Sequence, residues 1–229
     1  MFWIRVAVVA TRAAAMVLLA LAVLFAVYLG RAPVVASYEH ATHTREALPE
    51  LRAEVMQKII TPTVRQLADE GTPYSGVLYA GLMLTETGPK LIEYNCRFGD
   101  PECQVLMMRY RGDLAALMLA CATGKLAGLE AGAFDPAYAL TVVMAANGYP
   151  GTPEKGGAIA GLDSVTDAKV FHAGTAVKDG QLTATGGRVL NITARGDSLK
   201  EARDRAYDMV GEIDWREGFC RKDIGWRAL

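Results

Sequence analysis

Three polar residues at alternate positions, Glu93, Asn95 and Arg97, are the strongest candidates for chemistry in this sequence. In an extended segment, side chains two residues apart leave the same face, so this spacing predicts one polar face. A carboxylate beside an amide oxygen suits Mg²⁺, which prefers oxygen ligands and keeps waters and substrate phosphates as its others. The Arg97 guanidinium could pair with a phosphate or acyl-phosphate oxygen. The exposed face of an edge strand would show the same spacing, so the triplet alone leaves both interpretations open.

The sequence before the triplet predicts a β-hairpin that positions it. Residues 74–85 are rich in β-branched and apolar side chains, which favours a strand, and residues 90–95 are the expected returning strand. The segment Glu86-Thr87-Gly88-Pro89 between them is typical of a turn.

Helices are expected on both sides of the hairpin. Apolar residues at helical spacing predict a helix over residues 48–70, and Pro62 is expected to divide it in two. Asp100-Pro101-Glu102 are expected to begin a helix that runs through Leu114, because acids in a first turn suit the positive end of the helix dipole. A further helix is predicted over residues 113–123.

The second half of the chain predicts a small α+β domain. Ser198 is expected to cap a helix over residues 198–213, with Glu201 completing the capping pattern. Strands separated by glycine turns are expected at residues 139–146, 168–173, 181–185 and 188–194.

The first 30 residues are the most apolar part of the chain, because 26 of them are apolar. Residues 13–30 are 18 consecutive uncharged residues, near the lower limit of about 20 for a membrane-spanning helix. An apolar helix is therefore expected at the N-terminus. It could be a membrane anchor, a signal peptide cleaved after Ala36 to release an exported binding domain, or a leader produced by a shifted frame or a truncation.

Composition excludes several classes of protein. With 24 Lys and Arg against 25 Asp and Glu, no basic excess points to nucleic acid. The apolar fraction of 52% and the charged fraction of 21% exclude a disordered chain. His40 and His43 lie in a polar segment without a helix or strand pattern and without an obvious third ligand, which favours a solvated linker over a metal site. No Cys-x-x-Cys pair occurs, so free thiols in a reducing compartment are expected for Cys96, Cys103, Cys121 and Cys220.

Residues 93–102, Glu-Tyr-Asn-Cys-Arg-Phe-Gly-Asp-Pro-Glu, resemble the metal-binding strand of ATP-grasp ligases and, more narrowly, the signature of the phosphoribosylamine–glycine ligase family. Further segments resemble this family in its own order, across about residues 46–229. They are residues 79–83, 142–146, 148–151, 170–175, 186–190 and 219–227.

The resemblance implies an ATP-dependent enzyme of purine biosynthesis that uses Mg²⁺ or Mn²⁺ in the cytoplasm. Its substrates would be glycine and phosphoribosylamine, and its products glycinamide ribonucleotide, ADP and phosphate. Glu93 and Asn95 would be metal ligands and, with Arg97, would bind the nucleotide; Arg97 and Asp100 would be catalytic. Asp100 and Glu102 are candidates to receive the glycine ammonium, and helix capping would explain them equally well. Gly186-Gly187-Arg188 could approach the substrate, or could form a plain glycine turn.

The expected fold class is α+β in three parts. Residues 1–45 would be a leader and linker, residues 46–127 the C-terminal part of an ATP-grasp domain, and residues 128–229 a C-terminal ligase domain. The resemblance covers less than half of a full-length family enzyme and includes no glycine-rich nucleotide loop. We therefore expect no family-like turnover from this chain alone. An alternative function is an inactive ATP-grasp remnant that residues 13–30 tether to a membrane.

Overall fold

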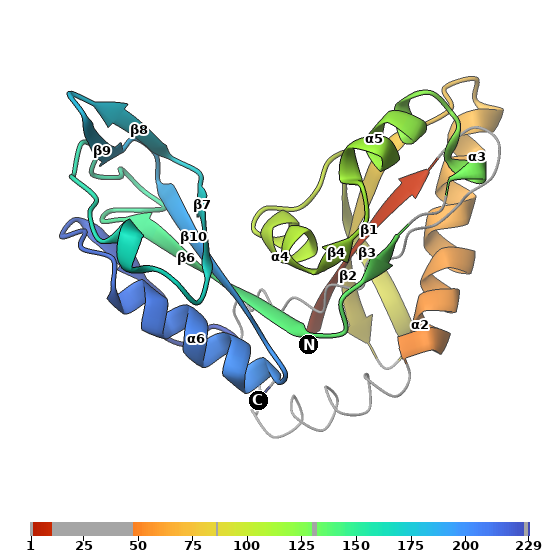
Figure 1. Ribbon diagram of the computed structural model, residues 1–229. Helices are drawn as coiled ribbons and strands as arrows, with labels where there is room; N and C mark the ends of the chain where they lie inside the picture. Colours follow the sequence, from red (N-terminus) through yellow and green to blue (C-terminus); the bar gives the residue numbers. More distant parts are fainter. Residues whose placement is uncertain (1, 11–47, 86, 130–131, 227–228) are drawn as a thin grey trace. The chain divides into compact units, whose positions relative to one another are not determined.

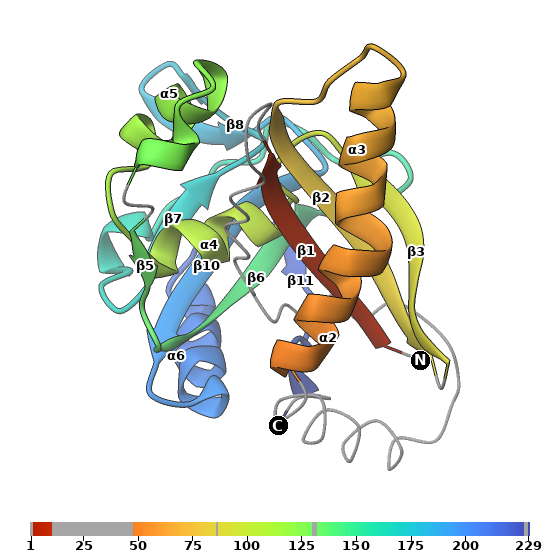
Figure 2. The same cartoon turned by 90° about the vertical axis from the view of Figure 1, so that its right-hand side faces the viewer.

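The computed structural model describes residues 2–10, 48–85, 87–129, 132–226 and 229, and Figures 1 and 2 show two views of it. The chain divides into two compact units. The first is built mainly from residues up to 102 and residues 110–135, and the second from residues 103–109 and 136–227. Helices and antiparallel strands are mixed in both units, which confirms the α+β class. The division between residues 127 and 128 stays a prediction.

A nearly continuous helical rod forms one layer of the first unit (Figure 2). Its parts are α2 (Leu48–Val55), the π-helical turn η1 (Met56–Ile60) and α3 (Thr61–Asp69). The predicted division at Pro62 takes the form of this widened turn, which ends two residues before the proline. Proline has no N–H to donate and clashes with the carbonyl four residues earlier, so a local change of helical pitch at this point is expected.

A three-stranded antiparallel sheet forms the other layer, with the order β1-β2-β3. The hairpin prediction is confirmed, because β2 (Gly76–Thr85) pairs with β3 (Gly88–Asn95). Leu78, Ala80 and Leu82 alternate along β2 and pack against Val55 and Ile60 of the helical rod. This alternation leaves Tyr79, Gly81 and Met83 to the opposite face of the sheet.

The N-terminal segment that precedes the apolar helix expected over residues 13–30 is extended. Residues Phe2–Ala10 form strand β1, which pairs with β2 along its full length. Ile4, Val6, Val8 and Val9 are β-branched, and the free edge of β2 offers backbone partners, so an extended conformation satisfies both preferences. Residues 13–30, His40 and His43 lie outside the described residues. No helix in the described part of the chain is long and apolar enough to span a membrane.

Two short helices follow the hairpin. Helix α4 ends at Arg109 and does not run through Leu114 as predicted, because a short bridge between β4 and β5 interrupts it. Tyr110 and Phe134 pack edge to face across this bridge, with ring centroids 5.6 Å apart. Asp113 caps α5 by accepting a hydrogen bond from the amide of Ala116 at 2.9 Å. The elements are α4 (Glu102–Arg109), β4 (Tyr110–Arg111), α5 (Leu114–Ala122), η2 (Leu126–Gly128) and β5 (Ala133–Phe134).

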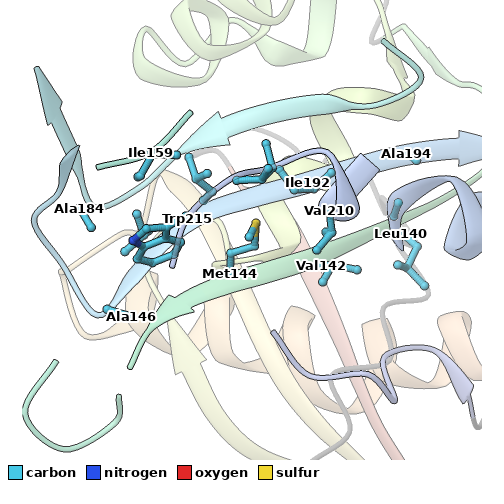
Figure 3. Close-up of a cluster of buried hydrophobic side chains, with 14 of the residues drawn as sticks. Leu140, Val142, Met144, Ala146, Ile159, Ala184, Ile192, Ala194, Val210 and Trp215 are labelled. Carbon is cyan, nitrogen blue, oxygen red and sulfur yellow. The ribbon is translucent and has the colours of Figure 1, made fainter. Parts of the chain in front are cut away.

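The second unit packs one long helix, α6 (Leu199–Gly211), on a four-stranded antiparallel sheet of order β11-β6-β10-β7. Figure 3 shows Val142, Ile192 and Val210 meeting in the core between this sheet and the helix. A separate hairpin, β8–β9, turns at Asp179-Gly180 with positive φ at both residues. The strands are β6 (Tyr138–Ala146), β7 (Lys169–His172), β8 (Thr175–Lys178), β9 (Gln181–Ala184), β10 (Arg188–Gly196) and β11 (Gly218–Cys220), with η3 at Leu162–Ser164.

The predicted cap of the long helix is confirmed. The Ser198 hydroxyl accepts from the amide of Glu201 at 3.1 Å, and the Glu201 carboxylate accepts from the amide of Asp197 at 2.7 Å. Further along the helix, the Tyr207 hydroxyl accepts from the amide of Ile224 and donates to the carbonyl of Arg221. Burial raises the pKa of Tyr207. The helix therefore holds the last described segment of the chain through side chains on its own face.

Candidate functional site

The candidate site lies on the strand β3, whose alternation puts Glu93 and Asn95 on one face. Tyr94 between them points to the other face, where its hydroxyl is 2.6 Å from the Thr63 hydroxyl and 3.3 Å from the carbonyl of Ile59. These contacts fix the rotation of β3 against the helical rod. Because successive side chains of a strand point to opposite faces, anchoring Tyr94 also orients both of its neighbours.

The structure brings Glu93 and Asn95 into direct contact. The Asn95 side-chain nitrogen Nδ2 donates to Glu93 Oε1 at 3.2 Å. The bond uses the NH₂ group of the asparagine side chain, which a cation would repel. In the part of the chain that the structure describes, Asn95 Oδ1 and Glu93 Oε2 have no hydrogen bond. Carboxylate and amide oxygens are the donors that Mg²⁺ prefers. The pair therefore fits a divalent cation by the chemistry of its donors.

The strand opposite β3 supplies no second carboxylate. In the register of the hairpin, Gly81 faces Glu93 and Tyr79 faces Asn95. The ladder is irregular between Gly81 and Leu82, and such bulges re-aim side chains next to functional sites. Among the described residues, no group of three or more His, Cys, Asp or Glu is placed to hold a metal ion. Mg²⁺ typically completes a set of one or two protein oxygens with water and phosphate oxygens.

Arg97 lies beyond the end of β3, which stops at Asn95. Its guanidinium is exposed, and Nη1 donates to the carbonyl of Phe98 at 2.8 Å. The predicted single face of three side chains therefore holds for Glu93 and Asn95, whereas Arg97 follows the turn that leaves the strand. This bond uses one of the guanidinium N–H groups, and the others can meet an anion.

Asp100 and Glu102 differ sharply in exposure. Asp100 is half-buried in the turn before α4, whereas Glu102, the first residue of the helix, is only 2% exposed. Glu102 lies so close to Gly99 that a Cβ atom there would overlap its carboxylate and approach the Tyr79 ring within 2.9 Å. Tyr79 is itself 1% exposed. Glu102 is thus an interior group at the helix start, and Asp100 is the more accessible of the two acids.

Tyr74 and Cys96 form an electrostatic feature beside the site that sequence inspection missed. Burial raises the pKa of Tyr74 to about 12, and the neighbouring Cys96 thiol adds to the rise. The Tyr74 hydroxyl donates to the carbonyl of Val77 at 2.7 Å, near the start of β2. Cys96 is exposed between Asn95 and Arg97 and is a free thiol. Tyr74 precedes β2 and Cys96 follows β3, so both lie at the open end of the antiparallel hairpin, and the predicted pairing of the two strands is the signal that could have indicated the contact.

Comparison with known proteins decides the family. The family models described as phosphoribosylglycinamide synthetase, ATP-grasp (A) domain, and phosphoribosylglycinamide synthetase, C domain, match residues 40–103 and 139–227. The phosphoribosylamine–glycine ligase of Mesorhizobium japonicum is 56% identical over 183 residues, which cover 79% of this chain and 43% of the relative. The chain belongs to the phosphoribosylglycinamide synthetase family.

Solved structures agree with this assignment to the phosphoribosylglycinamide synthetase family. The crystal structure of phosphoribosylamine–glycine ligase from Thermotoga maritima has a TM-score of 0.59 and 37% identity, covering 69% of this chain and 39% of that one. An L-amino acid ligase from Bacillus licheniformis shares the fold alone, with a TM-score of 0.54 and 14% identity, covering 93% of this chain and 53% of that one. The chain therefore spans less than half the length of the named family relatives.

The remaining candidate residues of this family member lie in the second unit. A Cβ atom on Gly187 would overlap the Tyr149 ring, and one on Gly174 would lie 2.8 Å from the Cα of Gly186. Gly174 and Gly186 thus approach each other at backbone distance and Gly187 lies against an aromatic ring, which explains these glycines by packing. Arg188 is exposed at the start of β10. His172 ends β7, and its Nδ1 lies 3.0 Å from the Thr175 hydroxyl.

Proposed function

We propose that the protein of which this chain forms at least a part joins glycine to phosphoribosylamine, with ATP and Mg²⁺ or Mn²⁺, in purine biosynthesis. One observation carries the proposal: the Glu93–Asn95 oxygen pair lies on β3, inside the region that matches the ATP-grasp domain of the family. The named relatives of this chain are phosphoribosylamine–glycine ligases. The activity, the substrates and the cofactors that we propose are inferred from those relatives.

Glu93 and Asn95 would hold the divalent cation through Glu93 Oε2 and Asn95 Oδ1. A bound metal–nucleotide complex supplies the phosphoryl group that activates a carboxylate, and the cation neutralises phosphate charge. Such a role needs fixed oxygen donors and no proton transfer, which agrees with an exposed carboxylate steadied by its asparagine neighbour. The predicted Mg²⁺ or Mn²⁺ site thus rests on two side chains of this chain.

Arg97 and Asp100 would act on the other groups of the reaction. The Arg97 guanidinium keeps free N–H groups at the end of β3, where they could pair with the oxygens of a transferred phosphoryl group. Asp100 is the accessible acid of the following turn and could receive an ammonium group by charge. Glu102 is nearly fully buried, so of the two acids considered for glycine we assign this role to Asp100.

A chimera tests the proposal. The matched 183-residue region of this chain replaces its counterpart in the Mesorhizobium japonicum ligase, and production of glycinamide ribonucleotide from ATP, glycine and phosphoribosylamine is measured. We expect an active chimera, and Glu93→Gln should lower kcat/KM by at least about 100-fold, because removing metal charge stabilisation costs several kcal/mol. Glu70→Gln at the end of α3 is the matched control and should change little. A folded but inactive chimera, or full activity with Glu93→Gln, contradicts the proposal.

The unmodified chain gives a second measurement. We expect Mn²⁺ with ATP to bind the 229-residue chain weakly and to broaden the amide resonances of β3, and Glu93→Gln to abolish this broadening. Glycinamide ribonucleotide should not form at a rate typical of the family. Family-like turnover by this chain alone would contradict that expectation.

A further inference from the structure

Gly81 on β2 lies directly opposite Glu93 and in closer contact with it than a side chain would allow. A Cβ atom built on Gly81 would be 2.9 Å from Glu93 Cγ and 3.6 Å from Glu93 Oε1. The same Oε1 accepts the hydrogen bond from Asn95. The Glu93 side chain therefore lies across the backbone of the neighbouring strand, in space that is open only because residue 81 has no side chain.

Backbone conformation does not explain the glycine at this position. Gly81 does not have a positive φ, and it lies inside strand β2, whose backbone conformation alanine also adopts. Replacing such a glycine by alanine ordinarily stabilises a protein, because the unfolded chain loses conformational freedom. The close approach of Glu93 predicts the opposite sign. Its Cγ is in the middle of the side chain, so relief of the clash requires rotation about χ1, which moves the whole carboxylate.

We propose that Gly81 is a positioning residue of the metal site: its missing side chain lets Glu93 fold over β2 and bring its carboxylate to the Asn95 amide. A Cβ at position 81 swings Glu93 Cγ away and separates Oε1 from Asn95 Nδ2. The hydrogen bond that joins the carboxylate to the side-chain amide is then lost. The inference rests on the proposed function for the identity of the ligand, whereas the contact itself is independent of it.

A double-mutant cycle tests the contact without any ligand. Gly81→Ala, Glu93→Ala and the double variant of the 229-residue chain are unfolded in urea. With Glu93 present, Gly81→Ala should raise the unfolding equilibrium constant about tenfold, a size usual for a buried clash. With Glu93→Ala, the same substitution should be neutral or stabilising. Gly211→Ala on α6 is the matched control, because nothing lies within 4 Å of its added Cβ.

The outcomes of the cycle are distinct even when folding is lost. If Gly81→Ala alone does not fold while the double variant does, the coupling to Glu93 is supported. If Gly81→Ala has the same effect with Glu93 and with Glu93→Ala, Gly81 acts independently of Glu93 and the inference is wrong. The inference is also wrong if Glu93→Ala folds but neither Gly81→Ala nor the double variant does.

Asparagine side-chain resonances report the geometry of the site directly. The chain has three asparagines, Asn95, Asn147 and Asn191, so ¹⁵N-asparagine labelling gives a simple spectrum with two internal controls. Gly81→Ala should shift the Asn95 side-chain amide signals, because the bond to Glu93 Oε1 is lost, and should leave the signals of the other two unchanged. Unchanged Asn95 signals overturn the inference.

Mn²⁺ binding separates the inference from the proposed function. Where wild-type chain binds Mn²⁺ with ATP, Gly81→Ala should weaken binding at least about tenfold, in the range seen when residues supporting metal ligands are lost. Equal binding by both proteins leaves the proposed metal site intact and overturns the role of Gly81. If the wild-type chain binds no Mn²⁺, the proposed metal site fails, and the asparagine signals and the cycle still decide the inference.

Discussion

The strands β3 and β10 follow the same alternation but have opposite surroundings. β3 is an edge strand, and its residues 90–93 are exposed. β10 is an interior strand of its sheet, and residues 189–194 are all buried. Polar groups behave accordingly: Thr193 on β10 donates to the Thr141 hydroxyl at 2.8 Å in the interior, whereas Glu93 on β3 keeps an oxygen open.

This difference indicates that β10 maintains the fold and that β3 is available to bind a ligand. A buried polar group must find a partner within the protein, since leaving it unsatisfied costs free energy. An exposed carboxylate needs no partner within the protein, because water solvates it until a cation binds. We therefore expect substitutions in β10 to change stability and substitutions in β3 to change binding. Three substitutions on these two strands test this contrast, and a fourth tests Tyr74 beside β3; they follow from the largest expected effect to the smallest.

Ile192→Ala should give the largest loss of stability. The side chain is fully buried at the centre of β10, and truncating buried isoleucine costs about 2–5 kcal/mol through lost transfer free energy and the cavity left behind. Urea unfolding followed by the fluorescence of the buried Trp215 measures it. Leu119→Ala is the control, because this α5 side chain is 65% exposed, and it should change the free energy of unfolding by less than about 0.5 kcal/mol.

Tyr94→Phe should have an intermediate effect. It removes the hydroxyl that contacts Thr63 and Ile59, so it should cost about 1 kcal/mol of unfolding free energy. Chemical denaturation measures the loss. Because Tyr94 orients β3, the variant should also weaken Mn²⁺ binding with ATP. A stability loss with unchanged binding would show that the rotation of β3 is set by other contacts.

Tyr74→Phe should alter the pH dependence of stability more than its value at neutral pH. The pKa of Tyr74 is raised to about 12 in the folded chain, against about 10 for a free tyrosine. Between these values the unfolded chain loses the phenolic proton first, so the stability that Tyr74 contributes is complete below pH 10 and is lost as pH rises towards 12. The advantage of wild type over Tyr74→Phe should therefore shrink across this window in urea titrations. A constant difference would contradict the assigned pKa.

Glu93→Ala should have the smallest effect on stability. Its carboxylate is exposed and has one hydrogen bond, to Asn95, so the free energy of unfolding should change by less than about 0.5 kcal/mol. Binding of Mn²⁺ with ATP should nevertheless be lost. Thermal unfolding and paramagnetic broadening, measured on one sample, compare the two. A destabilisation as large as that of Ile192→Ala would remove the contrast between β3 and β10.

Local patterns in the sequence predicted much of this structure. The hairpin, the strands of the second unit and the Ser198 cap all depend on residues close to one another in sequence, and all appear near their expected positions. The errors come from tertiary context. The strand over residues 2–10 was not predicted, because it depends on the edge that β2 offers for pairing. The helix from Glu102 ends early because Tyr110 and Arg111 pair with β5, more than twenty residues further on.

The candidate site divides in the same way. Sequence alone placed Glu93 and Asn95 on one face, because alternation in a strand is a local property. It also placed Arg97 there, and the structure differs because β3 ends before that residue. The contact of Tyr94 with Thr63 had no sequence signal, since it joins a strand and a helix whose relative rotation depends on packing.

The sequence by itself determined the family, the α+β class and the chemistry of the donors on β3. Tertiary structure decided which residue of β2 lies opposite Glu93. Gly81 faces Glu93 only in one register of the hairpin, next to an irregularity that inserts an extra residue on β3. A slip of one residue would set another β2 residue against Glu93 and turn every side chain to the opposite face. Register depends on the whole set of contacts between the sheet and the helical rod, which no local pattern contains.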